Sequence, residues 1–405
     1  MFATKFLVPA FAVLGLASAQ SSTSLCASAT VTISSVADAT ALASSCSTVQ
    51  GSVVIDPSFS GVVDLDGIEQ IKGDLSADGA ANVTALQASQ LNSIGGTFNL
   101  VGLVIMGTLQ MNSLTSVGQI NWKTLAALQF LGFESEIKKA ESLIISDTQL
   151  NNLDGINLDT VSVLDINNNP YLKNFSTQIA NVTGSFNMDS NAANLDLQLP
   201  NLIFAYNMTL RNISTISIPS LQSINTTLGF YGDHVESIIA PNLTSIGGDL
   251  AIVANSALTN VSMPLLKTVA HSFQIANNSQ LLNITGFPSL KTTGAVSLSG
   301  NYSQLELPAL ATVSGAFYAV SSGDFDCTPF HGDKFNQPPV IQGLFTCSPT
   351  SPDVQPSASS GSSTGTSTAS SPSSTSTTKS GATNVYVNSG LLLVGGLAGL
   401  VSLAL

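Results

Sequence analysis

A short pattern recurs along the middle of the chain and restricts its fold more than any other feature. It consists of an apolar residue, a variable one, an aliphatic one, two variable ones and an asparagine, as in LAIVAN (250–255), and leucine often follows three residues later. We call the asparagine position the slot. The best register fills it with Asn169, Asn191, Ile213, Asp233, Asn255, Asn278 and Asn301, at steps of 20 to 23 residues. Such a period indicates stacked units that bury their apolar faces only against each other.

The register extends in both directions and predicts the fold. Weaker turns have strands near Val53, Leu75, Phe98, Ile120, Leu143 and Phe317, with slots at Ser58, Ala80, Leu103, Leu125, Thr148 and Ser322. Prolines recur at one phase of the repeat, which marks a corner because proline would damage a central strand; they are Pro200, Pro219, Pro241, Pro264, Pro288 and Pro308. The prediction is a mainly β fold, a right-handed parallel β-helix or leucine-rich-repeat-like solenoid of about 13 turns of about 22 residues.

The slot asparagines Asn169, Asn191, Asn255 and Asn278 are interpreted as a structural ladder. A polar accident would not return at the same place after each strand, and a ligand-binding group would not be followed so regularly by an apolar leucine. Their side-chain amides are expected to bond backbone groups that a corner leaves unpaired.

One segment departs from the strand pattern. KTLAALQFLGFESEIKKAESL (123–143) has helical periodicity and charge. It predicts a helix, as an insertion or as one side of a turn.

The two ends of the chain carry targeting signals. Residues 1–19 have an early cation, an apolar run and small residues before the expected cleavage site, which is typical of a secretory signal peptide. Residues 382–405 predict a GPI signal that is removed, with Gly381 or Ser380 as the attachment residue; the alternative is a C-terminal membrane helix. Between them lie a predicted ectodomain (20–347) and a Ser/Thr-rich, O-glycosylated stalk (348–381).

Four cysteines remain after signal removal, which favours disulfides in a secreted chain. Three pairings are possible in principle. Cys26 with Cys46, and Cys327 with Cys347, would each close a local loop of about twenty residues at one end of the repeat region, and would tie down the cap segments there.

Eleven Asn-x-Ser/Thr sequons predict N-glycosylation at surface positions, at Asn82, Asn174, Asn181, Asn207, Asn212, Asn225, Asn242, Asn260, Asn277, Asn283 and Asn301. Asn174, Asn260 and Asn283 share one phase, so their glycans would line one edge of the solenoid. Asn301 is both a sequon and a slot residue. A buried ladder amide cannot also carry a glycan, so one of these two interpretations must be wrong.

Nothing in the sequence favours catalysis or a cofactor. The net charge of −13 and the 9% of charged residues exclude a nucleic-acid binder. Asp147 and Asp165 occupy similar phases, but no aromatic or basic residues accompany them as a glycosidase cleft would require. No histidine stands at ligand spacing from a cysteine, so no metal site is predicted.

The repeat units resemble leucine-rich repeats (Leu-x-Leu-x-x-Asn-x-x-Leu) in the looser form of the receptor L domain. The whole chain resembles the fungal GPI-anchored cell-wall organisation proteins of the extracellular-mutant and sporulation-specific type. The resemblance implies a mannosylated, non-enzymatic protein at the extracellular face of the plasma membrane and in the cell wall. Its implied partners are the membrane, through the GPI lipid, and wall polysaccharides (glucan, mannan) or other wall proteins, which it would bind or scaffold. A wall-remodelling carbohydrate-active enzyme on a β-helix and a receptor-like binding module are the alternatives.

Overall fold

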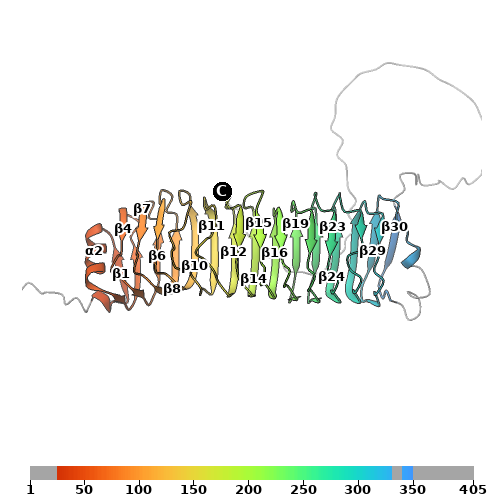
Figure 1. Ribbon diagram of the computed structural model, residues 1–405, viewed down its shortest axis with the longest axis horizontal. Coiled ribbons are helices and arrows are strands. Elements are labelled where there is room, and N and C mark those ends of the chain that lie inside the picture. Colours follow the sequence, from red (N-terminus) through yellow and green to blue (C-terminus); the bar gives the residue numbers. More distant parts are fainter. Residues whose placement is uncertain (1–24, 331–339, 350–405) are drawn as a thin grey trace, which may run out of the picture. The chain divides into compact units, whose positions relative to one another are not determined.

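The computed structural model describes residues 25–330 and 340–349, which form an elongated parallel β-solenoid (Figure 1). It has about 13 turns with a disulfide at each end, which confirms the predicted fold class. The predicted signal peptide, the GPI signal, Ser380 and Gly381 and almost all of the stalk lie outside the described residues. Within the described part of the chain no helix is long and apolar enough to span a membrane.

One parallel sheet of twenty strands runs along the solenoid and receives one long strand, or two short ones, from each turn. Its strands are β1 (Thr30–Ile33), β2 (Thr48–Val49), β3 (Ser52–Ile55), β5 (Gln70–Ile71), β6 (Leu75–Asp78), β8 (Ser93–Val101), β10 (Ser116–Leu125), β11 (Ser142–Thr148), β12 (Thr160–Asn167), β14 (Asn181–Asp189), β16 (Phe204–Arg211), β18 (Ser223–Ile224), β19 (Leu228–Tyr231), β21 (Ser245–Ile246), β22 (Leu250–Val253), β24 (Thr268–Ala276), β26 (Thr292–Gly300), β28 (Thr312–Val313), β29 (Phe317–Ser321) and β30 (Phe345–Pro349).

A second side of most turns contributes a short strand to one of four small parallel sheets. They are β4 (Ser60–Asp64) with β7 (Asn82–Gln87) and β9 (Thr108–Gln110); β13 (Asn174–Ser176) with β15 (Asp196–Gln198) and β17 (Thr215–Ser217); β20 (Ser237–Ile239) with β23 (Asn260–Ser262); and β25 (Asn283–Ile284) with β27 (Gln304–Leu305).

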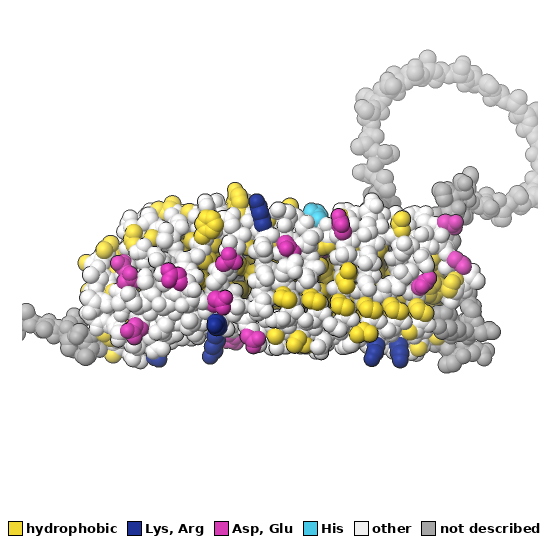
Figure 2. All heavy atoms as spheres, in the orientation of Figure 1, with side chains coloured by type: hydrophobic (Ala, Val, Ile, Leu, Met, Phe, Trp, Pro, Cys, Tyr) yellow, Lys and Arg dark blue, Asp and Glu magenta, His cyan; other side chains and the backbone are white. Residues whose placement is uncertain are grey.

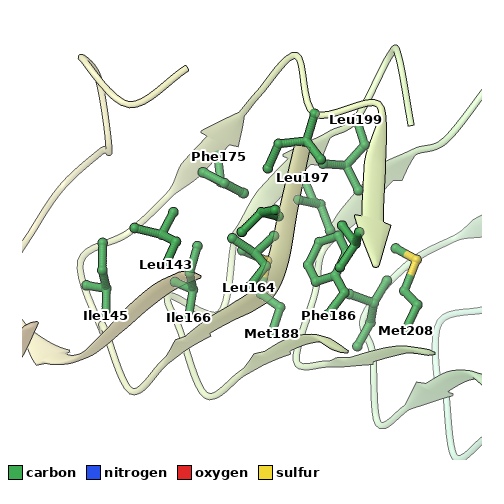
Figure 3. Packing of buried hydrophobic residues seen from close by; sticks show 14 of the residues in the cluster. Leu143, Ile145, Leu164, Ile166, Phe175, Phe186, Met188, Leu197, Leu199 and Met208 are labelled. Atoms are coloured by element: carbon green, nitrogen blue, oxygen red, sulfur yellow. The ribbon is translucent and has the colours of Figure 1, made fainter. Parts of the chain in front are cut away.

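The core lies between these two sides because alternate strand residues point inward and meet their equivalents in the next turn. Leu143, Leu164 and Phe186 occupy neighbouring strands in register, and Ile145 with Ile166 forms a parallel row. Figure 3 shows these side chains packed against each other inside the turns. All five are at most 1% exposed, so the apolar rows form one continuous core along the solenoid.

The recurring prolines lie at corners where no ladder hydrogen bond is lost. Each occupies the second position of a turn that is closed by a buried leucine three residues after the turn begins; Leu266 N–H, for example, donates to the Met263 carbonyl at 3.1 Å. The equivalent leucine N–H closes the turns around Pro219 and Pro288. Proline at this position loses nothing because its fixed φ suits the turn and no N–H is required of it. Figure 2 shows a line of apolar side chains along the C-terminal half of the solenoid.

The predicted helix over 123–143 is wrong. Residues up to Leu125 complete β10, β11 begins at Ser142, and single bridges join the residues between them to neighbouring turns. Leu125, Leu128 and Ile137 are buried in the solenoid core. Their spacing is set by corners, since the Leu128 N–H closes a turn on the Leu125 carbonyl at 3.1 Å. Apolar residues three apart at a corner thus imitate helical periodicity.

Ten strands of the main sheet, from β6 to β24, end in the same way, with a left-handed residue followed by the buried slot. The residue before the slot has a φ of 52° to 60° at Thr124, Asp147, Asn168, Ser190, Asn212, Ala254 and Asn277, and glycine takes the position at Gly79, Gly102 and Gly232. The sharp turn points the next N–H into the interior, where no strand carbonyl can receive it. This corner was not apparent from the sequence because many residue types occupy the left-handed position.

From Thr148 to Asn278, slot side chains satisfy most of these buried N–H groups from one turn to the next, whereas the earlier slots Ala80, Leu103 and Leu125 carry no side-chain acceptor. Asn255 N–H donates to Asn278 Oδ1 at 2.8 Å, and Asn255 Oδ1 accepts the Asp233 N–H at 2.8 Å. The amide nitrogen of Asn255 also donates to the Phe230 carbonyl at 3.2 Å. Asn169 and Asn191 form a second run, in which Asn191 Oδ1 accepts the Asn169 N–H at 3.2 Å. The two runs are separate because Ile213, in the slot between them, carries no side-chain acceptor.

The ladder ends before the last turns. Asn301 is half-buried and its amide donates to the Ser279 carbonyl at 2.9 Å, outside the ladder. Tyr302 is buried beside it and packs against Phe325. In the first and last turns the buried residues are Phe59 and Ser321, so the predicted slots Ser58 and Ser322 are each one residue off.

Caps close both ends of the core. Helix α2 (Val36–Ser45) covers the first turn, begins with a capping box between Ser35 and Asp38, and is tied by the Cys26–Cys46 disulfide. At the other end the 3-10 helix η1 (Thr328–Phe330) and β30 are joined by the Cys327–Cys347 disulfide. Phe330 and Phe345 both pack on Phe317 there.

Replacing Asn255 by alanine is expected to lower the free energy of unfolding by about 1–3 kcal/mol, because the Asp233 N–H would be buried without an acceptor. Urea denaturation measures this. The matched control is Asn201→Ala, which removes the amide of an exposed corner residue and should change stability by less than about 0.5 kcal/mol. Equal effects at the two positions would contradict the ladder.

The left-handed corner can be tested with two glycines. A Cβ at Gly232 would meet no atom within 4 Å, yet its φ is +63°, so Gly232→Ala should cost about 1 kcal/mol through backbone strain alone. Gly107 is equally unobstructed but lacks a positive φ, so Gly107→Ala should not destabilise. A destabilisation at Gly107 as large as at Gly232, measured by thermal unfolding, would argue against the strain.

Candidate functional site

Several acidic side chains of the described residues accept hydrogen bonds from the backbone. Asp74 accepts the Thr97 N–H at 2.7 Å in the next turn, and Asp326 accepts the Thr328 N–H at 2.8 Å. The Thr328 hydroxyl is the main reason that the pKa of Asp326 lies below its ordinary value. The described part of the chain holds no group of three His, Cys, Asp or Glu residues that could bind a metal ion.

Asp147 and Asp165 do not form a facing pair. Asp147 is the left-handed corner residue at the end of its strand. Asp165 stands in the register row of Ile144, on the outer face of the main sheet, and accepts hydrogen bonds from Asn167 at 2.9 Å and Asn187 at 2.8 Å. The Asn168 amide donates to Asp147, so each carboxylate is occupied by a local structural contact, whereas glycosidase carboxylates flank a substrate bond.

Asp233 is the one slot residue that can titrate. It is fully buried, and its Oδ1 accepts the Ile213 N–H at 2.8 Å, whereas its Oδ2 has no hydrogen-bond partner. Burial is the main cause that raises the pKa of Asp233 to about 7; the hydrogen bonds from Ile213 and Tyr231 and the Arg211 charge oppose it, and the Asp189 charge adds to it. A protonated carboxyl offers one acceptor and one donor, as the asparagine amide does in neighbouring turns.

The buried carboxyl should make stability fall as pH rises. Because its folded pKa of about 7 exceeds the unfolded value, the stabilisation is complete below about pH 4 and is lost between about pH 4 and pH 7, by up to about 4 kcal/mol. Asp233→Asn should abolish this pH dependence and stabilise the protein above pH 7. Urea denaturation across this range checks it. The control, Asp165→Asn, alters an outward carboxylate, and an unchanged pH profile in Asp233→Asn would contradict the interpretation.

On the face that Figure 2 shows, charged side chains are scattered without a strong patch. A compact group lies on the outer face of the main sheet, where Arg211 lies 3.8 Å from an Asp189 oxygen and 5.1 Å from the centre of the Tyr231 ring. The Tyr231 ring covers Gly229, since a Cβ there would come within 2.3 Å of it. Burial is the main cause that raises the pKa of the Tyr231 hydroxyl. The geometry fits a structural cation–π contact.

None of the eleven predicted glycosylation positions is buried. The exposed ones are Asn82, Asn174, Asn225, Asn242, Asn260, Asn277 and Asn283, and the half-buried ones are Asn181, Asn207, Asn212 and Asn301. Asn174 begins β13, Asn260 begins β23 and Asn283 begins β25, so these three lie on the side formed by the small sheets. No sequon lies between Asn82 and Asn174, whereas ten lie from Asn174 to Asn301.

A groove of about 440 Å³ lies in the part of the solenoid that has no sequon. Residues 107–112 of one turn and 130–134 of the next line it. Its walls are joined by a parallel bridge between Gln110 and Gly132, and the Gly132 N–H donates to the Leu109 carbonyl at 2.8 Å. Phe130 is 61% exposed, and the Asn112 amide donates to Glu134 Oε1 at 2.7 Å. The groove thus combines an accessible aromatic ring with amide and carboxylate groups.

The groove exists because the row of small sheets is interrupted there. β9 is the last strand of its small sheet, and β13 begins the next small sheet. Between them, this side of the turns makes only isolated bridges. The sequence did not reveal the groove, because residues 123–143 were interpreted as a helix and exposed aromatic residues could not be located. The only sign of the groove in the sequence is that residues 123–143 depart from the strand pattern.

The fold and its surface define a class: a long repeat solenoid with polar ladders inside and a glycosylation-competent exterior. The model of the family described as "Ecm33: GPI-anchored cell wall organization protein" matches residues 1–43. Protein ecm33 of Aspergillus fumigatus is 43% identical over 80% of this chain and 81% of its own length. The cell surface GPI-anchored protein of Arthroderma benhamiae is 38% identical over 86% of this chain and 88% of its own. The cell wall protein ecm33 of Schizosaccharomyces pombe is 30% identical over 75% and 72%, respectively.

These relatives identify the family, and the chain belongs to the Ecm33 family of GPI-anchored cell wall organization proteins. The resemblance to fungal GPI-anchored cell-wall organisation proteins, and the location at the cell surface and cell wall, expected from the sequence are thereby confirmed, whereas the likeness to the receptor L domain stays a prediction. No solved structure matches the chain.

Proposed function

We propose that this protein is a non-catalytic scaffold of the fungal cell wall, held at the outer face of the plasma membrane by a GPI lipid. The observation that supports it most is the 43% identity, over most of both chains, to a protein named ecm33 in a family described by cell wall organization. The relatives' names are those of surface and wall proteins.

The architecture suits a spacer or binding rod. About 13 turns at a strand spacing of about 4.8 Å give a length of about 60 Å. In this proposal residues 1–19 direct secretion, residues 348–381 form a glycosylated stalk, and the lipid replaces residues 382–405 at Gly381 or Ser380. Glycans at the eleven sequons would keep most of the rod hydrated and separate from its neighbours.

The carbohydrate-active enzyme alternative gains no support from the site. Asp165 accepts two asparagine hydrogen bonds on the outer face of the main sheet. Asp233, whose pKa is raised, is fully buried and faces the core. The two carboxyls thus lie on opposite sides of the sheet and do not form an acid–base pair.

The scaffold role predicts a wall defect without a loss of hydrolytic activity. Deleting the gene in its host should increase sensitivity to wall-binding dyes and osmotic stress, and the full chain should restore resistance. A chain lacking residues 382–405 should be secreted and should not restore it, because the anchor is missing. Normal wall resistance in the deletion strain would contradict the role, and release of sugars from wall polysaccharide by the purified protein would contradict the absence of catalysis.

A further inference from the structure

We propose that the groove between residues 107–112 and 130–134 binds a segment of a β-linked glucan chain. The proposal rests on the proposed wall function, to which it adds a site and a ligand class.

The lining of the groove fits a neutral sugar chain. Gln110, Asn112 and Glu134 supply amide and carboxylate groups that can donate to and accept from hydroxyls. Phe130, 61% exposed, offers an accessible ring whose negative face attracts the C–H groups of a pyranose. A few placed polar groups beside aromatic surface are the composition expected of a small-molecule site.

The walls of the groove are fixed before any ligand binds. The ring of Phe133 lies 6.1 Å from that of the fully buried Trp122. Phe133 also packs against Gly155, where an added Cβ would come within 2.7 Å of it. The segment that carries Phe130 is thereby anchored on its inner side, and little ordering entropy remains to oppose binding.

Of two hollows of similar volume, the groove at Phe130 is the one that no predicted glycan would cover. A second hollow of about 400 Å³ is lined by Gln178, Asn201, Gln222 and others, and includes the exposed sequon residue Asn242. A glycan on Asn242 would occupy it, and its lining contains no aromatic residue. The groove at Phe130 lies in the stretch from Asn82 to Asn174, where the sequence has no sequon.

The ring chemistry favours glucan over mannan. In a β-linked glucose unit all ring substituents are equatorial, so both faces present C–H groups to an aromatic ring. Mannose carries an axial hydroxyl that makes one face polar. The exposed ring of Phe130 therefore fits the flat faces of a β-glucan.

Binding of laminarin oligosaccharides, a soluble β-glucan, to the full-length glycosylated protein tests the proposal by isothermal titration calorimetry. Phe130→Ala should weaken binding by about tenfold or more, and Phe130→Trp should retain it. The matched control is Tyr171→Ala, which removes an aromatic ring of similar exposure, 50%, away from the groove. Thermal unfolding should be unchanged in all three variants because Phe130 and Tyr171 are exposed.

Three outcomes would overturn the proposal: no binding of laminarin by the wild-type protein, equal loss in Phe130→Ala and Tyr171→Ala, or binding of α-linked mannan as tight as that of laminarin. The proposed function fails separately, through normal wall resistance in the deletion strain. If deletion of the gene impairs the wall but the Phe130→Ala protein fully restores wall resistance, the scaffold role stands, and the protein does not perform it through the groove.

Discussion

The structure depends on how each strand ends. In ten turns, from Gly79 to Asn277, a left-handed residue turns the chain inward at the end of a main-sheet strand, and the next N–H enters the core without a backbone acceptor. A buried N–H without a partner costs about as much as a lost hydrogen bond. From Thr148 to Asn255, successive turns supply an acceptor at this point, except where Ile213 fills the next slot. The side-chain oxygen of the following slot residue does so, as in the bond from Asn255 N–H to Asn278.

This dependence makes the ladder directional and sensitive to single residues. The slot of one turn satisfies the turn before it, so a residue without a side-chain oxygen interrupts the run, as Ile213 does after Asn191. Asp233 keeps the run intact with an acid in place of an amide, at the cost of burying a carboxyl. Stability along the solenoid is then a sum of neighbour terms, as expected of repeat proteins.

The candidate binding groove lies where the regular pattern fails. A repeat with identical turns presents rows of identical side chains, and such rows offer little concave surface. Between β9 and β13 the small sheets are interrupted, and the chain forms a hollow with Phe130 at its mouth. Local departures from the sequence pattern are often functional sites. The structure has no helix over 123–143, but this segment does differ from the other turns.

The sequence alone determined the repeat length, the about 13 turns, the slot asparagines and the corner prolines. These are readable because a solenoid contacts mainly itself one period away, so its constraints recur at fixed spacing. The tertiary structure alone decided the left-handed corner, which Thr124, Ala254 and Gly232 all adopt despite different propensities. It also removed Asn301 from the ladder, since Tyr302 takes the buried place beside it. The groove belongs to the same category, because Phe130 and Asn112 are brought together only when two turns stack.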